Sequence, residues 1–403
     1  MSADTSAPIR APEPPAPPPV PRGATARLRA SLRRAAPALG LYAAGRLIGL
    51  VCLAVWAGRA GKHPRTLLGY SWDSVWYVGI VRHGYDSGLP PDPAKHGAPF
   101  SDMAFFPLFP MLMRTLTTVL PLTAVTAGLV VAWLAAGVAA WGIYAVGELL
   151  HGRRVGTALV VLWGLLPHAI VQSMAYTEPL LTALAAWSLY AVLTRRWLWA
   201  GALAFLAGAA RPNGIAVAAA VCCCAAAHLG RRRTARGAGA WRVWAGAALS
   251  PLGWLGYLAW VGCRRGSWRG YFAVQDEWGS RFDFGVSVLR FVRSLLISKA
   301  SFTYFMALAI LSVALVLFAL LTADRPPLSL LVYTLVLITI TFGGSNYFAS
   351  KPRFLLPAFP LLLPVAIAMA RARPRTAVLT GGALAGLSFV YGTYLLAVAR
   401  IPM

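Results

Sequence analysis

The segment GYSWDSVWYVGIVRHGY, residues 69–85, gathers side chains that can take up protons and hold charge. Its acid, Asp73, stands in a chain with only 12 acidic residues against 37 lysines and arginines. A carboxylate in such a setting can act as a general base, because it can take the proton of a nearby nucleophile. Asp73 is therefore the candidate catalytic residue. The neighbouring candidates for substrate binding are Trp72, Trp76, Tyr77, Arg82 and His83.

The spacing in this segment predicts a helix over residues 71–83 that lies along a membrane surface. Its apolar positions recur at intervals of three and four and share one face: Trp72, Val75, Trp76, Gly79 and Ile80. Tryptophan suits the membrane interface, where an apolar ring and a polar N–H are both accommodated. A structural role for Asp73 also stays open, since an acid in a first helical turn is stabilised by about 0.3–1 kcal/mol. Arg82 and His83 also have a structural alternative, because cations near the C-terminal end of a helix are stabilised by the helix dipole.

Polar residues beside other apolar runs complete the set of candidate binding residues. They are Asp102 before AFFPLFP, Glu178 in AYTEPLL, Arg211 and Asn213 in ARPNG, and Lys351 and Arg353 in KPRFLLPAFP. Each has a structural alternative: a helix start for the acids, a tight turn for Pro-Asn-Gly, and snorkelling for the last two cations. An ionisable group at membrane depth is nevertheless a functional candidate. For Arg211 we expect either a phosphate or Glu178 as the partner.

One well-placed acid and several cations suit the transfer of a sugar from a lipid phosphate. The leaving phosphodiester needs no general acid, so one carboxylate suffices to deprotonate the acceptor hydroxyl. Cations at the same depth stabilise the departing phosphate. Neither a cofactor nor a metal ion is required for this chemistry. The sequence also lacks H-E-x-x-H, a metal-binding D-x-D and a helix-opening G-x-G-x-x-G, which argues against a soluble nucleotide-sugar enzyme.

Composition predicts a polytopic, all-α membrane protein. The 403 residues are 58% hydrophobic and 12% charged, with a mean hydropathy of +0.64, and apolar runs of bilayer-spanning length recur along the chain. The net charge of +25 does not indicate a nucleic-acid partner, because the basic residues form short clusters between apolar runs. The five cysteines lie in or at the ends of apolar runs and form no metal or disulfide framework.

Hydropathy predicts about 11 spans in one domain, residues 37–400, after a disordered, basic, Pro- and Ala-rich tail, residues 1–36. The arginine clusters fall on one side of this scheme, which the positive-inside rule makes cytoplasmic, together with the N-terminus. Two long loops, at about 58–103 and 263–301, fall on the extracytoplasmic side. They carry most of the acids, so we expect the active site of this multi-pass cell-membrane protein on that side.

An ordered set of motifs resembles the PIG-V family, the GPI mannosyltransferase 2-like enzymes and their bacterial relatives. The motifs are WDSVWYVGIVRHGY (72–85), AFFPLFPMLMR (104–114), AYTEPLLTALAAWSLY (175–190), ARPNG (210–214) and KPRFLLPAFPLL (351–362). The resemblance implies a helical bundle of the GT-C glycosyltransferase class. It implies mannose transfer from a polyprenyl-phosphate-mannose donor at the outer face, and it matches Asp73 to the proposed base of that class. We expect inversion at the sugar because only one displacement occurs.

The acceptor does not carry over from the resemblance, and a glycolipid, a lipoglycan or a protein hydroxyl all stay open. Two other functions remain as alternatives. A transporter or flippase for lipids or glycolipids would use the same cations to hold a phosphate without cleaving the glycosidic bond. A noncatalytic subunit of a glycosyltransferase complex would have no transfer activity by itself.

Overall fold

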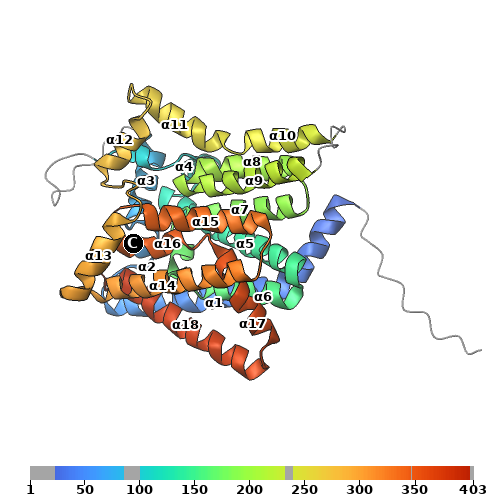
Figure 1. Ribbon diagram of the computed structural model, residues 1–403. Helices are drawn as coiled ribbons and strands as arrows, with labels where there is room; N and C mark the ends of the chain where they lie inside the picture. Colours follow the sequence, from blue (N-terminus) through green and yellow to red (C-terminus); the bar gives the residue numbers. More distant parts are fainter. Residues whose placement is uncertain (1–22, 86–99, 232–238, 346, 400–403) are drawn as a thin grey trace, which may run out of the picture.

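The computed structural model describes residues 23–85, 100–231, 239–345 and 347–399, and within these ranges the chain forms helices and no strand (Figure 1). The α-helices are α1 (Ala24–Arg59), α2 (Pro64–Gly69), α3 (Asp73–His83), α4 (Leu108–Val119), α5 (Ala124–His151), α6 (Arg153–Gly164), α7 (Glu178–Leu193), α8 (Trp197–Ala210), α9 (Ile215–Arg231), α10 (Ala240–Leu249), α11 (Leu252–Arg264), α12 (Gly270–Glu277), α13 (Val286–Ile297), α14 (Phe302–Ala323), α15 (Leu328–Gly343), α16 (Lys351–Phe354), α17 (Leu363–Arg371) and α18 (Pro374–Ala397). Short 3-10 helices are η1 (Asp102–Ala104), η2 (Ala169–Ser173), η3 (Pro212–Gly214), η4 (Phe348–Ser350) and η5 (Phe359–Leu362).

Five helices in the described residues are long and apolar enough to cross a bilayer: Thr25–Arg59, Ala124–His151, Pro212–Gly230, Phe302–Ala323 and Pro374–Ala397. A sixth span is formed if Phe348–Phe354 and Phe359–Arg371, which are bent by 78°, count as one. Three shorter apolar helices accompany them: Glu178–Leu193, Trp197–Ala210 and Leu328–Gly343. These helices identify a membrane protein, while the count of about 11 spans stays a prediction.

The first helix begins earlier than the sequence predicted. The disordered tail was placed at residues 1–36, but α1 is already helical from Ala24. Residues 24–36 therefore belong to a helix that continues into the first span, and Ala35 and Ala38 are fully buried against the bundle. The prediction of a disordered tail was wrong for residues 24–36, and its remaining part, residues 1–22, lies outside the described residues.

Small residues allow the apolar helices to approach one another closely. Alanines from α5, α7, α8 and α9 make up much of the main buried cluster. At the contact between α8 and α10, a Cβ atom on Gly201 would collide with the backbone of Gly246, and one on Gly246 with the backbone of Trp197. Helices without a hydrophobic driving force between them associate through such close backbone packing in a bilayer.

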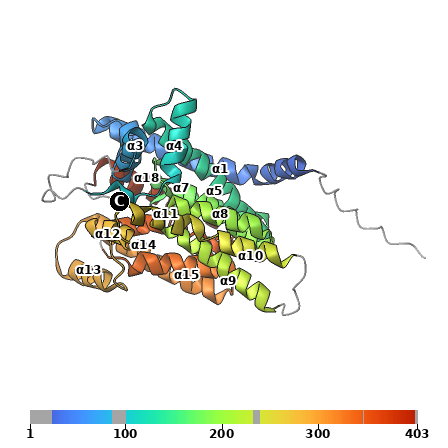
Figure 2. The same ribbon diagram turned by 90° about the horizontal axis from the view of Figure 1, so that it is seen from above.

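Several of the short helices gather at one end of the bundle. In Figure 1, α2, α3, α12, α13 and α16 lie at the left-hand end of the long helices, and Figure 2 shows α3, α12 and α13 at the same end from above. The turn between α17 and α18, which carries Arg371 and Arg373, lies at the other end. Within the described residues, the regions predicted as two long loops therefore contain the helices α2, α3, α12 and α13, which lie at this end of the bundle.

Candidate active site

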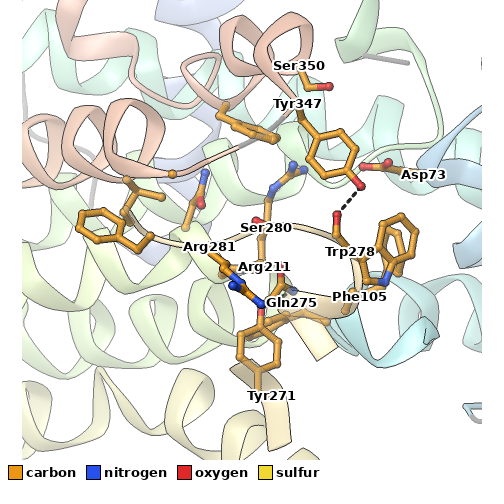
Figure 3. Close-up of a pocket in the computed structure, with 18 of the residues that line it drawn as sticks. Asp73, Phe105, Arg211, Tyr271, Gln275, Trp278, Ser280, Arg281, Tyr347 and Ser350 are labelled. Atoms are coloured by element: carbon orange, nitrogen blue, oxygen red, sulfur yellow. Dashed lines mark hydrogen bonds between the residues drawn. The ribbon is translucent and has the colours of Figure 1, made fainter. Parts of the chain in front are cut away.

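A cavity of about 1030 Å³ opens at this end of the bundle. Its walls come from α3, the segment before α4, η3, α12 with the residues that follow it, and the region around α16 (Figure 3). Eight of the predicted site residues line it: Trp72, Asp73, Trp76, Tyr77, Arg211, Asn213, Lys351 and Arg353. The fold thus gathers residues from four distant sequence motifs around one space.

Asp73 is the first residue of α3, as the structural alternative also predicted. The preceding residue, Trp72, has a left-handed φ of 50°, a conformation that costs a non-glycine residue energy and is common at functional sites. The backbone N–H of Asp73 donates to the Tyr176 hydroxyl at 3.2 Å. The carboxylate stays 20% exposed and lines the cavity, so a substrate hydroxyl can reach it.

Two carboxylates and two guanidinium groups form a connected charge network at the cavity wall. Arg353 Nη2 lies 2.7 Å from Asp73 Oδ2, and its Nε lies 3.7 Å from Glu178 Oε1. The same Glu178 oxygen lies 2.7 Å from Arg211 Nη1, which also donates to the Thr177 hydroxyl at 2.9 Å. Opposite charges alternate along this network. Asp73 is the more exposed of its two acids: the Asp73 side chain is 20% exposed and the Glu178 side chain only 1%.

Aromatic rings hold the two guanidinium groups in place. The Arg353 guanidinium lies 5.1 Å from the ring centroid of Tyr176 and 5.2 Å from that of Phe354, and Arg211 lies 5.2 Å from the same Phe354 ring. A cation over an aromatic face is attracted by the ring quadrupole, and most strongly where water is excluded. Both arginines therefore have few alternative positions.

Lys351 lines the cavity, but its ammonium group also binds the end of a helix. Its Nζ donates to the carbonyl oxygens of Thr341 at 2.8 Å and Gly344 at 2.6 Å, at the C-terminal end of α15. An ammonium group has three N–H donors, so these contacts use two of them. Side chains also donate to backbone carbonyl groups in the bend after α16. Trp163 Nε1 donates to the Leu356 carbonyl, and the Tyr333 hydroxyl donates to the Pro357 carbonyl.

The wall opposite α16 comes from a segment whose role the sequence did not assign. Trp278 packs at 4.9 Å from Trp76 and 5.4 Å from Phe105, measured between ring centroids. The Tyr347 hydroxyl donates to the Trp278 carbonyl at 2.7 Å, and Figure 3 shows the Tyr347 ring beside Asp73. Burial, and then the negative charge of Asp73, raise the pKa of Tyr347, so its hydroxyl stays a donor at neutral pH. Tyr271, Gln275, Ser280 and Arg281 line the same wall.

The predicted surface stripe of α3 is contradicted at Gly79 and Ile80, while Trp72, Val75 and Trp76 are partly exposed. Gly79 and Ile80 are buried within the protein, and Trp76 stacks on Phe105 at 5.7 Å between ring centroids. The buried side of the helix also includes Tyr77 and Val78. Tyr77 and Val78 belong to a buried cluster that includes residues of α4 and α5. The indole of Trp76 instead packs against Phe105 and Trp278.

Four of the predicted residues do not line the cavity. Arg82 and His83 are exposed at the far end of α3. Asp102 is buried in η1, where the Ser101 side chain accepts from the Met103 N–H. Glu178 lies behind the wall and reaches the cavity only through the two arginines. No group of three or more His, Cys, Asp or Glu residues with the geometry of a metal site occurs in the described ranges.

No family model matches the sequence, and no curated protein does. Among solved structures, the chain is similar to ArnT from Cupriavidus metallidurans bound to undecaprenyl phosphate, with a TM-score of 0.53 and 16% identity over 89% of this chain and 64% of that one. The fold is that of the GT-C membrane glycosyltransferases. The chain spans less than two thirds of ArnT, and at this identity the likeness concerns the fold. An Archaeoglobus fulgidus oligosaccharyltransferase, AglB with an inhibitory peptide and a dolichol-phosphate, has a TM-score of 0.45 and 12% identity over 88% of this chain and 55% of that one.

Proposed function

We propose that this chain is an integral-membrane glycosyltransferase that uses a polyprenyl-phosphate-linked sugar. The observation that carries the proposal is the partly exposed Asp73 carboxylate in a cavity whose wall also holds Arg353 and Arg211. The fold supports it, because the similar ArnT structure was solved with undecaprenyl phosphate. One acid beside cations at a membrane-bound cavity matches what transfer from a lipid phosphate requires.

In the proposed reaction, Asp73 takes the proton of the acceptor hydroxyl. The acceptor oxygen forms a bond to the anomeric carbon while the bond from that carbon to the phosphate oxygen breaks. Polyprenyl phosphate leaves as an anion, and the sugar configuration is inverted because one displacement occurs. Asp73 Oδ2 is held by Arg353 at 2.7 Å, so the other carboxylate oxygen is the one we assign to the acceptor proton.

The departing phosphate gains negative charge and needs cations beside it. We assign this role to Arg353 and Arg211, whose guanidinium groups can bind two phosphate oxygens in a planar fork. Lys351 is assigned as a third cation, through the N–H donor that its two carbonyl contacts leave over. Arg82, His83 and Asp102 have no role in this mechanism, since they do not line the cavity.

We propose mannose as the sugar, on the strength of the sequence resemblance to the PIG-V family. Trp278, Trp76 and Tyr271 supply flat apolar faces on the wall opposite α16, and such faces suit the apolar side of a sugar ring. The acceptor is a hydroxyl of a glycolipid, a lipoglycan or a protein. Its site is the part of the cavity nearest Asp73.

The proposed orientation places the cavity on the extracytoplasmic side of the cell membrane. The turn that carries Arg371 and Arg373 lies at the opposite end of the bundle from α3 and α16. The N-terminal arginines and the cluster at 153–154 belong to the same side in the sequence-based topology. Arginine-rich short connections are typical of the cytoplasmic side, which leaves the cavity outside.

The decisive experiment is a transfer assay with the purified full chain. Polyprenyl-phosphate mannose labelled in the sugar is incubated with glycolipid, lipoglycan and peptide acceptors, with the polyprenyl-phosphate forms of other hexoses in parallel. The proposal expects labelled acceptor and free polyprenyl phosphate in equal amounts, with mannose preferred. Movement of intact donor across a vesicle membrane without release of polyprenyl phosphate would instead identify a flippase. Activity that appears only with a second protein would identify a noncatalytic subunit.

A further inference from the structure

Helix α13 and the residues before it expose apolar side chains beside the cavity. Phe284 is 86% exposed, Leu289 and Leu296 are each 72% exposed, and Ile297 is 78% exposed. The other side of the helix is anchored, since Val288 and Leu295 are buried. Phe291 packs at 5.0 Å from Tyr304 and 4.6 Å from Phe348, measured between ring centroids. An apolar patch of this kind on a firmly held helix marks an interaction surface.

Basic residues adjoin the exposed apolar side chains. Leu289 and Leu296 are seven positions apart and form one line along the helix, and Arg290 and Arg293 lie on the adjacent line. Both arginines and the following Lys299 are exposed. The sequence has no acid from Phe284 to Ala323, so this surface carries only positive charge. Apolar and cationic lines side by side are the arrangement of a helix that lies in a membrane interface.

The connection to α14 fixes the depth of α13. The 22 residues of α14 rise about 33 Å, which matches the hydrocarbon core of a bilayer. Its first residue, Phe302, therefore lies at a membrane boundary. The four residues between Ile297 and Phe302 extend at most about 14 Å. Figures 1 and 2 show α13 beside the ends of α14 and α15 rather than in line with them.

We propose that α13 and Phe284 form a docking surface for anionic phospholipid in the leaflet on the cavity side. Phe284, Leu289 and Leu296 take the acyl region, while Arg290 and Arg293 bind the phosphates of the headgroups. A lipid surface is favoured over a protein partner because the helix is already held at bilayer depth by its short connection to α14. Basic residues near an anionic membrane surface add directly to the binding of such a segment.

The bound lipid is linked to the cavity by the segment that joins α12 to α13, residues 278–285, which we call the strap. The Asp283 N–H donates to the Gly343 carbonyl at 2.9 Å, and the Ser345 N–H donates to the Arg281 carbonyl at 2.6 Å. The Asp283 carboxylate accepts from the N–H groups of Gly285 and Ser287, at the start of α13. Lipid that holds α13 therefore also holds the strap against the cavity residues around Gly344.

Native mass spectrometry of the detergent-solubilised full chain tests the docking surface. The protein is titrated with phosphatidylglycerol and, in parallel, with phosphatidylcholine of the same chain length. We expect wild type to bind phosphatidylglycerol more tightly. The double variant R290Q/R293Q should bind it about 30-fold more weakly, since each basic residue near an anionic lipid contributes about fivefold in affinity. L289Q/L296Q should weaken binding of both lipids.

The matched control is R371Q/R373Q, which removes two exposed arginines at the other end of the bundle. It should keep the phosphatidylglycerol affinity of wild type. Equal affinity of wild type for the two lipids or full binding by R290Q/R293Q would overturn the proposal. An equal loss of phosphatidylglycerol affinity in R290Q/R293Q and R371Q/R373Q would also overturn it. None of these measurements depends on sugar transfer, so they separate failure of the lipid site from failure of the proposed enzyme function.

Hydrogen exchange tests the link between α13 and the strap. Phosphatidylglycerol should slow exchange at the amides of Asp283 and Ser345 several-fold in wild type, because both amides donate to the hydrogen bonds that join the strap to residues 343–345. The same lipid should leave these amides unchanged in R290Q/R293Q. Unchanged exchange in wild type with lipid bound would overturn the link and confine the lipid to α13.

Discussion

The guanidinium of Arg353 lies 2.7 Å from the carboxylate of Asp73, which joins the first residue of α3 to the broken helix at α16. Arg353 is only 7% exposed, so the pair lies at the boundary between the cavity and the protein interior. Arg353 also faces a second acid on the buried side, since its Nε lies 3.7 Å from Glu178 Oε1. Glu178 in turn pairs with Arg211. The position of the proposed base thus depends on a charge network that spans four distant parts of the chain.

The first prediction concerns Asp73 itself. D73N keeps the size of the side chain but removes the base, so transfer should fall by at least about 100-fold, as is usual for loss of a general base. The protein should remain folded and inserted, because asparagine can still contact Arg353. E277Q is the matched control: it alters an exposed acid on α12 that pairs with Arg265 and does not line the cavity. Full transfer by D73N would remove Asp73 from the mechanism.

The second prediction concerns stability. R353M leaves the Asp73 and Glu178 carboxylates without their shared cation, and breaking a buried pair in this way costs about 3–5 kcal/mol. Thermal unfolding in detergent should therefore show a large loss. The comparison is R265M, which breaks the exposed pair with Glu277 and should cost less than about 1 kcal/mol. Similar unfolding temperatures for both variants would show that the Arg353 network adds little to the fold.

The third prediction concerns the coupling of Glu178 and Arg211. A double-mutant cycle with E178Q and R211M should give an interaction energy of about 1–3 kcal/mol, because the two side chains touch and share a network. E178Q should also lower the transfer rate of the enzyme by changing the position of Arg353, although Glu178 does not line the cavity. Additive stability effects together with an unchanged rate would leave Glu178 without a positioning role.

The sequence alone pointed to several residues that the fold brings to the cavity, and their roles in binding and catalysis stay predictions. Asp73, Arg211 and Arg353 stand out because charged side chains are rare beside apolar runs, and such residues need partners in a bilayer. Of the two partners expected for Arg211, a phosphate or Glu178, the structure has Glu178 at 2.7 Å. The pairing of Asp73 with Arg353 was not predicted, since no local rule connects residues that are brought together only by the packing of the whole bundle.

The errors also have physical reasons. Arg82 and His83 follow Asp73 closely in sequence, but His83 lies ten residues along a straight helix, which is about 15 Å from its start. Nearness in sequence therefore did not place them at the cavity. Trp278 and Tyr347 were missed because each contributes through a tertiary contact, the hydrogen bond from the Tyr347 hydroxyl to the Trp278 carbonyl. The aromatic and charged character of residues 267–284 was the available signal.

The fourth prediction separates two roles of Lys351. K351M removes two hydrogen bonds to the end of α15, and each bond from a charged group contributes about 1.5–3 kcal/mol. It also removes a proposed phosphate ligand, so KM for the lipid donor should rise about tenfold. K62M is the matched control, because Lys62 caps the end of α18 by donating to the Ala397 carbonyl at 2.6 Å and does not line the cavity. A rise in KM for both variants would mean that the effect comes from loss of structure.

The last prediction concerns the pH dependence of the strap. Hydrogen bonds to its carboxylate hold the pKa of Asp283 below its ordinary value of 3.8, foremost the bond from the Ser287 side chain and then those from the backbone N–H groups of Ser287 and Gly285. Because the folded pKa is the lower one, this contribution to stability is complete above pH 3.8. It is lost as the pH falls through the lowered pKa, when the protonated group no longer binds both amides. Hydrogen exchange at Gly285 and Ser287 should therefore become faster, relative to amides elsewhere in α13, only below pH 3.8. In D283N the same amides should exchange at a relative rate that does not change with pH. A similar acid-induced change in D283N would show that another group controls the strap.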